Sequence, residues 1–360
     1  MSKRHLLAFA LALCVAPALA QQGPKPVPTD AATRKAVIAE LSSQLKANYV
    51  FPDVADKLAI ALAAKEANGG YAQAKDSETF AEALSKDLRA LGNDGHFAVG
   101  YDPEFRATPS NAVPDAASLE AMRQEIASHG FGIDSVKRLP GNVGYLEIRG
   151  FGPTAMVGPA ISGAMTMLSG TDALILDLRR NGGGEPDTVA YLMSHFFAQG
   201  DDRHLNDLYF RNGDKTRQYW TIPSVGPRYT RPVYVLTSGR TFSGGEECAY
   251  DFQTQKRAKI VGEKTGGGAN PGDGYAIGKG YAAFIPNGRA INPITGTNWE
   301  HVGVAPDVAV PAPDAQKVAH AAILRDLIAK TSNPDEKAGL QDVLKDVEAG
   351  TAPAPVYKMR

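Results

Sequence analysis

The chain has 360 residues, and its 38 Lys and Arg nearly balance its 39 Asp and Glu, for a formal net charge of −1. This length provides enough apolar side chains for one large domain or two modest ones. The balanced charge excludes the basic field that attracts nucleic acid, so no nucleic-acid partner is expected. Because its many glycines and prolines are spread along the chain, the composition favours an α/β protein with numerous loops.

The first twenty residues have the pattern of an export signal. A basic start precedes a short apolar run, and Ala18-Leu19-Ala20 supplies the small residues of a cleavage site. The apolar run is too short to span a membrane, so we expect a periplasmic or secreted protein with no stable membrane anchor. Removal of residues 1–20 leaves Cys248 as the one cysteine, which excludes an internal disulfide. Residues 21–30 are expected to form a loose leader.

Apolar residues at helical spacing dominate residues 31–92. Three helices are predicted there: one from Ala31, one opened by Pro52, and one that stops at Gly92. This pattern indicates a small N-terminal helical domain over residues 31–92. Residues 93–140 carry few strong signals and are expected to connect this domain to the rest of the chain.

From residue 141 onward, apolar strands alternate with helical segments. Buried strands are predicted at 143–148, 173–178, 233–236 and 259–262. Strands that alternate with helices at this spacing build parallel βαβ units, so residues 141–311 are predicted to form an α/β core with a central sheet. A β-hairpin is expected at 274–289, with its turn at 286–289. Residues 312–360 are expected to be a helical tail.

A serine stands at one strand-to-helix junction of this core. The strand at 233–236 runs into a small polar turn, and Ser243 precedes Gly244 and a helical pattern. A serine at the carboxyl end of a strand faces the first N–H groups of the following helix, which is the geometry that a nucleophile and its oxyanion site need. The same position suits a simple N-cap, and Thr241 occupies the first glycine position of the G-x-S-x-G pattern. This stretch alone therefore fits both interpretations.

The glycine-rich loop at 182–184 follows the preceding strand and is expected at the same edge of the sheet. It offers a backbone amide, most plausibly that of Gly183, as a partner of Gly244 in an oxyanion site. The loop matches neither of the phosphate-binding patterns GxxxxGK[ST] and GxGxxG. The histidines do not have the spacing of metal ligands. No cofactor and no metal site are therefore expected.

Several side chains compete for the role of general base, and spacing alone does not choose among them. They are Lys264, His96, His301 beside Glu300, and the pair Glu246 and Glu247. Lys264 would form a Ser–Lys dyad with Ser243, whereas His96 belongs to a distant turn. Asp94, two residues before His96, is a candidate to orient that histidine, but its turn sequence favours a simple turn residue.

Several short stretches, in a fixed order from about residue 48 to 310, resemble the C-terminal-processing (tail-specific) serine peptidase family. They are residues 48–53, 94–96, 144–148, 176–184, 240–246, 261–266 and 303–307. Two departures define the branch. Gly268 stands where the Ser–Lys branch has its lysine, and about 47 residues separate His96 from Gly144, too few for a PDZ domain. The chain is therefore similar to the branch of the tricorn core protease and of interphotoreceptor retinoid-binding protein repeats.

This resemblance implies a crotonase/ClpP-like core and an exported serine peptidase that acts on peptides or proteins. In the tricorn branch the serine works with a histidine and a glutamate, which match His96 and Glu300 here. The implied roles are Ser243 as nucleophile, His96 as base, Glu300 as an assisting group, and the amides of Gly244 and Gly183 as the oxyanion site. Two alternatives remain: a carrier of lipophilic ligands on the same fold, and a non-peptide serine hydrolase such as an esterase.

Overall fold

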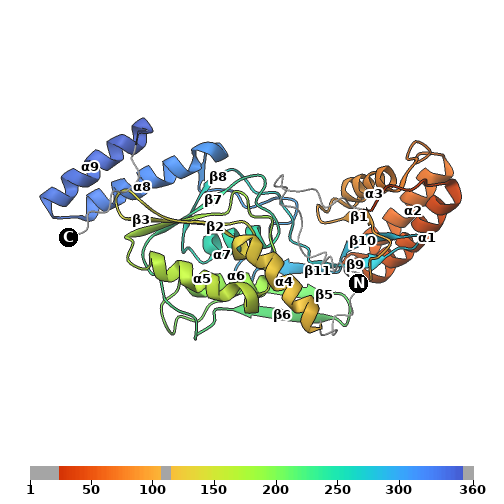
Figure 1. Ribbon diagram of the computed structural model, residues 1–360, viewed down its shortest axis with the longest axis horizontal. Helices are drawn as coiled ribbons and strands as arrows, with labels where there is room; N and C mark the ends of the chain where they lie inside the picture. The colour runs from red at the N-terminus through yellow and green to blue at the C-terminus, as the bar shows by residue number, and fades with distance from the viewer. Residues whose placement is uncertain (1–23, 107–114, 352–360) are drawn as a thin grey trace.

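The computed structural model describes residues 24–106 and 115–351, so the expected export signal lies outside the described residues. The molecule is elongated, with the N-terminal helices at one end, a mixed sheet in the middle and the C-terminal helices at the other end (Figure 1). Within the described ranges, no helix combines the length and the apolar character that a membrane crossing requires.

Three N-terminal helices form where the sequence predicts them. They are α1 (Ala31–Asn48), α2 (Pro52–Ala67) and α3 (Ser77–Gly92). Asp30 and Asp76 accept hydrogen bonds from the first turns of α1 and α3, and Pro52 opens α2, so each start has a local cause. The apolar faces of these helices pack against β1 (Ala98–Tyr101) and against two later strands.

The two later strands are β9 (Gly272–Ala276) and β10 (Tyr281–Pro286), which form an antiparallel sheet in the order β1-β10-β9. Helices α1–α3 and this sheet form one N-terminal unit, and residues from much later in the sequence therefore complete it. The hairpin turns at Gly278–Gly280, where backbone φ is positive, and the predicted turn at 286–289 is wrong. After Pro286 the chain instead enters β11 (Gly288–Ile291), which pairs with β5 (His204–Phe210).

Strand β5 also pairs with β6 (Lys215–Trp220), and the sequence analysis predicted neither strand. All of β6 except Tyr219 is exposed, so it lacks the apolar alternation that reveals a strand. The described residues contain two 3₁₀ turns, Gly130–Gly132 and Ala312–Asp314.

The central sheet has six strands in the order β12-β8-β7-β4-β3-β2. Its bounds are β2 (Ile133–Leu139), β3 (Val143–Ile148), β4 (Ala173–Asp177), β7 (Val233–Thr237), β8 (Lys259–Gly262) and β12 (Val308–Ala309). All neighbours are parallel except β2 and β3. The four strands that the sequence predicts form the parallel centre, as the βαβ pattern requires.

Helices cover both faces of this sheet. On one face lie α5 (Thr154–Leu168), α6 (Pro186–Ser194) and α7 (Gly244–Thr254), and on the other lies α8 (Ala315–Lys330), with α9 (Pro334–Ala349) packed on α8. Helix α4 (Ala116–Ser128) lies alongside α5 (Figure 1). Alternate strand residues serve the two faces: Leu176 and Val235 join the α5–α7 core, whereas Ile175 and Tyr234 join the α8 core.

A buried acidic pair interrupts the apolar face of α7. Glu247 and Asp251 lie one turn apart and fully inside the protein, beside Asn206 of β5. Burial raises the pKa of Glu247 to about 7, and burial together with the charge of Glu247 raises the pKa of Asp251. The pair therefore holds more protons in the folded chain than in the unfolded chain at mildly acidic and neutral pH.

We predict that this pair makes the folded state less stable as pH rises from about 5 to 8. A carboxyl with a raised folded pKa contributes its stability below the unfolded pKa and loses it as pH rises through the folded pKa, by at most about 1.4 kcal/mol per pH unit for one proton. Glu247→Gln removes that loss, so the variant should gain stability relative to the wild type with increasing pH. Urea unfolding at several pH values measures the difference.

The matched control is Glu82→Gln, whose side chain is exposed on α3 and lies outside the core. Parallel pH profiles for wild type and Glu247→Gln would show that the pair does not titrate in this range. Because the comparison is a difference between two variants, the opposite contributions of the buried histidines His195 and His320 cancel.

Candidate active site

The loops that follow β4 and β7 leave the same edge of the sheet because the two strands are parallel neighbours. Side-chain and backbone hydrogen bonds join these loops along their length. Thr241 Oγ1 donates to Leu178 O at 2.8 Å, Ser238 Oγ donates to Arg179 O at 2.6 Å, and the Phe242 N–H donates to Asn181 O at 3.0 Å. The glycine-rich loop and the serine turn are therefore held as one rigid edge.

Ser243 lies at the start of α7 with φ of 52° and ψ of −123°. Residues other than glycine rarely adopt this backbone conformation, and it persists only where the surrounding structure restrains it. Close packing supplies one restraint: a Cβ added to Gly183 would lie 2.8 Å from the Cβ of Ser243. Only glycine at position 183 allows the two loops to approach this closely.

Glu246 supplies the second restraint. Its buried carboxylate accepts hydrogen bonds from the Ser243 N–H at 3.0 Å, Thr265 Oγ1 at 2.5 Å, the Gly267 N–H at 2.6 Å and the Gly268 N–H at 2.8 Å. Burial raises the pKa of Glu246, and these hydrogen bonds oppose the rise by favouring the charged form. The carboxylate thus joins the serine turn to the loop after β8. Because its oxygens already accept these four hydrogen bonds, Glu246 has a structural role and does not serve as the base.

Lys264, the other base candidate near this loop, has an exposed side chain. The neighbouring Thr265 turns inward to Glu246, so the two residues point in opposite directions. The described contacts of the Ser243 turn do not include the Lys264 amine. The geometry therefore does not favour a dyad of Ser243 with Lys264.

His96 reaches the serine turn from the N-terminal unit. It follows the end of α3, where Asn93 takes a left-handed conformation, and it precedes β1. Its ring packs against the ring of Phe242 with centroids 4.6 Å apart. A Cβ at Gly268 would lie 2.7 Å from His96 Cε1 and 2.3 Å from Phe242 Cζ, so these two rings fill the space that a larger residue at 268 would need.

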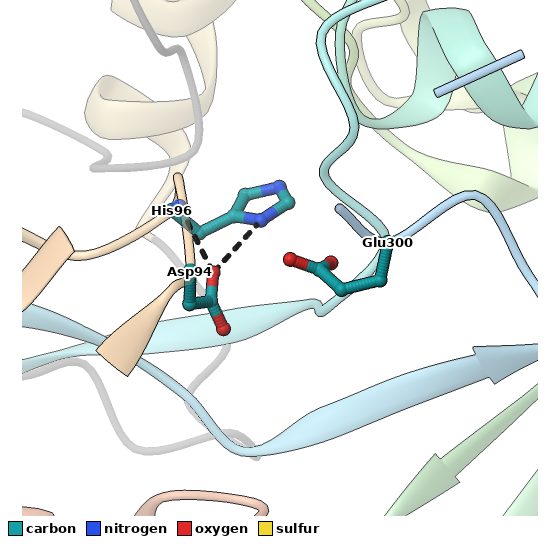
Figure 2. Close-up of side chains that lie close together, drawn as sticks. All are labelled: Asp94, His96 and Glu300. Carbon is teal, nitrogen blue, oxygen red and sulfur yellow. Dashed lines mark hydrogen bonds and ion pairs between the residues drawn. The ribbon is translucent and has the colours of Figure 1, made fainter. Parts of the chain in front are cut away.

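Two carboxyl groups face His96 (Figure 2). Asp94 Oδ1 accepts a hydrogen bond from the His96 backbone N–H at 3.0 Å and lies 3.5 Å from His96 Nδ1. Asn270 Nδ2 donates to the other Asp94 oxygen at 2.9 Å, and the Tyr49 hydroxyl donates to it at 3.3 Å. Glu300 projects toward the same group from the opposite side, and one of its oxygens accepts a hydrogen bond from the Ala269 N–H.

These two carboxyl groups differ in their protonation. Burial alone would raise the pKa of Asp94, but the adjacent His96 ring, the hydrogen bond from Asn270 and the His96 backbone N–H more than offset it and lower the pKa. Burial, reinforced by the negative charge of Asp94, raises the pKa of Glu300 to about 8. Near neutral pH, Asp94 is therefore ionised and Glu300 holds a proton.

The two predicted oxyanion donors lie side by side but are not equivalent. The Gly244 N–H is the first of α7 and has no hydrogen-bond partner in the described part of the chain. The Gly183 N–H lies beside it and donates to Asn181 Oδ1 at 2.8 Å. The geometry therefore offers the Gly244 amide directly, whereas the Gly183 amide already has an internal partner.

The structure brings together Ser243, Gly244 and Gly183 on one edge, and His96 with Glu300 beside it. His301 is exposed, with its Nδ1 3.4 Å from Glu300 Oε1. Sequence reasoning favoured a turn role for Asp94 over the role of orienting His96, whereas the structure buries Asp94 against His96. Its signal was the spacing of two residues from His96 across a glycine, and its partners Asn270 and Tyr49 gave no signal of their own.

Comparisons with known proteins agree with this architecture. Peptidase family S41 matches residues 142–310, and the N-terminal domain of Peptidase_S41 in eukaryotic IRBP matches residues 27–135. The carboxy-terminal processing protease CtpB of Bacillus subtilis (strain 168) is 27% identical over 151 residues, which are 40% of this chain and 28% of that protein. The chain spans less than half the length of the curated relatives it matches.

Solved structures show the same fold. Mature CPAF complexed with lactacystin aligns with a TM-score of 0.55 at 13% identity, over 87% of this chain and 99% of that chain. The tricorn protease aligns with a TM-score of 0.50 at 14% identity, over 88% of this chain and 37% of that chain. Two matching segments of one family, in order and along most of the described chain, confirm the resemblance read from the sequence motifs. The chain belongs to peptidase family S41, a family of serine-type peptidases, and has an N-terminal domain of the IRBP type.

Proposed function

We propose that this protein is an exported serine peptidase of the C-terminal-processing type that hydrolyses peptide bonds in proteins or peptides. One observation carries the proposal: the backbone of Ser243 is held in a rare conformation at the start of α7, and the preceding Phe242 packs against the ring of His96, which faces Asp94. The names of the processing proteases that the chain resembles support the substrate class. The parallel order of β3, β4, β7 and β8 supports a crotonase-like core.

In this proposal the Ser243 hydroxyl attacks the carbonyl carbon of the scissile peptide bond. His96 accepts the hydroxyl proton on Nε2 and returns it to the leaving amine, so the first half-reaction leaves an acyl-serine and a free amine. A water molecule then takes the place of the amine, and the same histidine activates it. The histidine must be neutral and must have its Nε2 lone pair free at the start.

Asp94 supports this role of His96. Its ionised carboxylate faces Nδ1, which favours the tautomer with the proton on Nδ1 and stabilises the imidazolium that forms during attack. The separation of 3.5 Å exceeds a hydrogen bond, and such contacts commonly tighten when substrate binds. We assign Asp94 as the positioning residue for His96. Glu300 assists as a second group on the Nδ1 side, and its hydrogen bond from Ala269 fixes the adjoining loop.

The Gly244 N–H is the proposed principal oxyanion donor because it lies at a helix N-terminus and has no competing partner in the described chain. One such donor contributes on the order of 3–4 kcal/mol to transition-state stabilisation. The Gly183 N–H adds a second donor once its hydrogen bond to Asn181 opens. This loop is close enough to take part because residue 183 has no side chain.

We predict that Ser243→Ala abolishes hydrolysis of casein and of a peptide library and leaves the melting temperature nearly unchanged. The serine hydroxyl acts in the reaction, whereas the backbone of the turn is held by Glu246 and by packing on Gly183. A serine-directed phosphonate should label the wild type at Ser243 and leave the variant unlabelled.

Equal loss of activity and of thermal stability would contradict this assignment. A wild type that is inert toward peptides but cleaves esters would favour the esterase alternative. If it also resists the phosphonate and quenches a fluorescent retinoid or fatty acid, the carrier alternative would stand instead.

We also predict that His96→Ala lowers kcat by roughly 10² to 10⁴, as expected for loss of a general base. Asp94→Asn should lower kcat with little change in KM, because the amide no longer favours the tautomer with a free Nε2. Lys264→Ala is the matched control and should retain most activity, since its side chain is exposed and outside the cluster. Steady-state kinetics on one peptide substrate compare the three variants.

An inactive Lys264→Ala variant beside an active His96→Ala variant would reverse the assignment and restore the Ser–Lys dyad. A change in KM alone for Asp94→Asn would assign that residue to substrate binding and not to the orientation of His96.

A further inference from the structure

The cluster of Asp94, His96 and Glu300 has the composition of a transition-metal site. Each residue offers one donor atom, and the three donor atoms lie within 4.8 Å of one another. Two carboxylate oxygens and one imidazole nitrogen form a donor set that suits Zn²⁺, whereas Mg²⁺ and Ca²⁺ prefer oxygen alone. Its members are separated by up to about 200 residues, so no local motif indicates the site.

The buried side chains leave donor atoms without hydrogen-bond partners. Neither ring nitrogen of His96 has one within the described ranges, although its side chain is only 9% exposed. Glu300 Oε1 is likewise without one, at 7% side-chain exposure, and His301 Nδ1 lies 3.4 Å away at the rim. Buried polar atoms without partners are uncommon and indicate a missing ligand, ion or water. Figure 2 shows one ring nitrogen of His96, one carboxyl oxygen of Asp94 and one of Glu300 directed toward the space between the three side chains.

Neighbouring groups hold the second carboxyl oxygen of Asp94 and of Glu300 in place by hydrogen bonds. Asn270 and Tyr49 bind the outer oxygen of Asp94, and the Ala269 N–H binds the second oxygen of Glu300. Such outer hydrogen bonds orient ligands and support metal affinity. Bonds of about 2.0–2.1 Å in a tetrahedral site place the ligand atoms about 3.4 Å apart. The donor atoms of the cluster now lie within 4.8 Å of one another, so side-chain rotations that move them about 1 Å closer together would allow them to bind a metal.

We propose that Asp94, His96 and Glu300 form a binding site for Zn²⁺ and that the bound metal inhibits the enzyme. The metal would bind His96 through Nδ1, which is the nitrogen that faces the two carboxyl groups. A neutral imidazole that donates its Nδ1 lone pair to a metal carries its proton on Nε2. Nε2 then has no lone pair to accept the Ser243 proton, so the bound chain is inactive. The inhibitory half of this proposal rests on the proposed function, and the binding half does not.

The binding half is tested on the mature Ser243→Ala chain, which keeps every proposed ligand and cannot react. Isothermal titration with ZnCl₂ should show one Zn²⁺ per chain, and MgCl₂ should give no signal at the same concentrations. Adding Glu300→Gln or His96→Ala to this chain should weaken Zn²⁺ binding at least tenfold. His129→Ala is the matched control, since His129 pairs with Glu125 on the exposed surface at 3.7 Å and should leave the binding unchanged.

Absence of stoichiometric Zn²⁺ binding would overturn the site, as would equal affinities of the Ser243→Ala chain with and without Glu300→Gln. Circular dichroism and melting of each variant show whether a loss of binding comes from misfolding, and Glu300→Gln keeps the shape of the side chain for this reason.

The inhibitory half is tested on the wild type with a peptide substrate. Hydrolysis should fall with Zn²⁺ over the concentration range that saturates the Ser243→Ala chain, and EDTA should restore it. Binding without inhibition would overturn this half. A wild type that binds Zn²⁺ but cleaves no substrate, even after EDTA, would leave the site in place and reject the proposed peptidase. An active wild type that binds no Zn²⁺ would support the proposed peptidase and reject the metal site.

Discussion

The Glu246 carboxylate is the constraint on which the rest of the site depends. It binds the backbone of Ser243 and, at the same time, three groups of the loop after β8. A buried charge with this many donors is costly to disturb, because removing it would leave several backbone amides unpaired. The interaction therefore converts a flexible strand-to-helix turn into a fixed one, and it holds Gly268 at the distance that admits His96.

The space at Gly268 links the two halves of the molecule. The central sheet supplies Ser243 and the N-terminal unit supplies His96, and the rings of His96 and Phe242 meet where residue 268 has no side chain. Strands β9 and β10 extend from the loop after β8 into the N-terminal unit, where β10 pairs with β9 and with β1, the strand that starts two residues after His96. Relative movement of the two halves would thus change the distance between the proposed base and nucleophile directly.

The histidine environment can serve catalysis and metal binding for the same physical reason. A base must be neutral, oriented and partly shielded from water, and the same conditions favour an imidazole as a metal ligand. The same three side chains, Asp94, His96 and Glu300, therefore place one imidazole nitrogen and two carboxyl oxygens within 4.8 Å of one another.

The elements with strong periodicity could be predicted from the sequence: the three N-terminal helices, the four parallel strands of the core, and the Ser243 and glycine loops at one sheet edge. Strand direction alone places those loops together, so local pattern was sufficient. It failed for β5, whose buried residues include the polar Asn206, for the exposed strand β6, and for the glycine-rich hairpin turn. The surroundings of His96 depend on tertiary contacts, because Asp94, Asn270 and Glu300 come from segments that are distant in the chain.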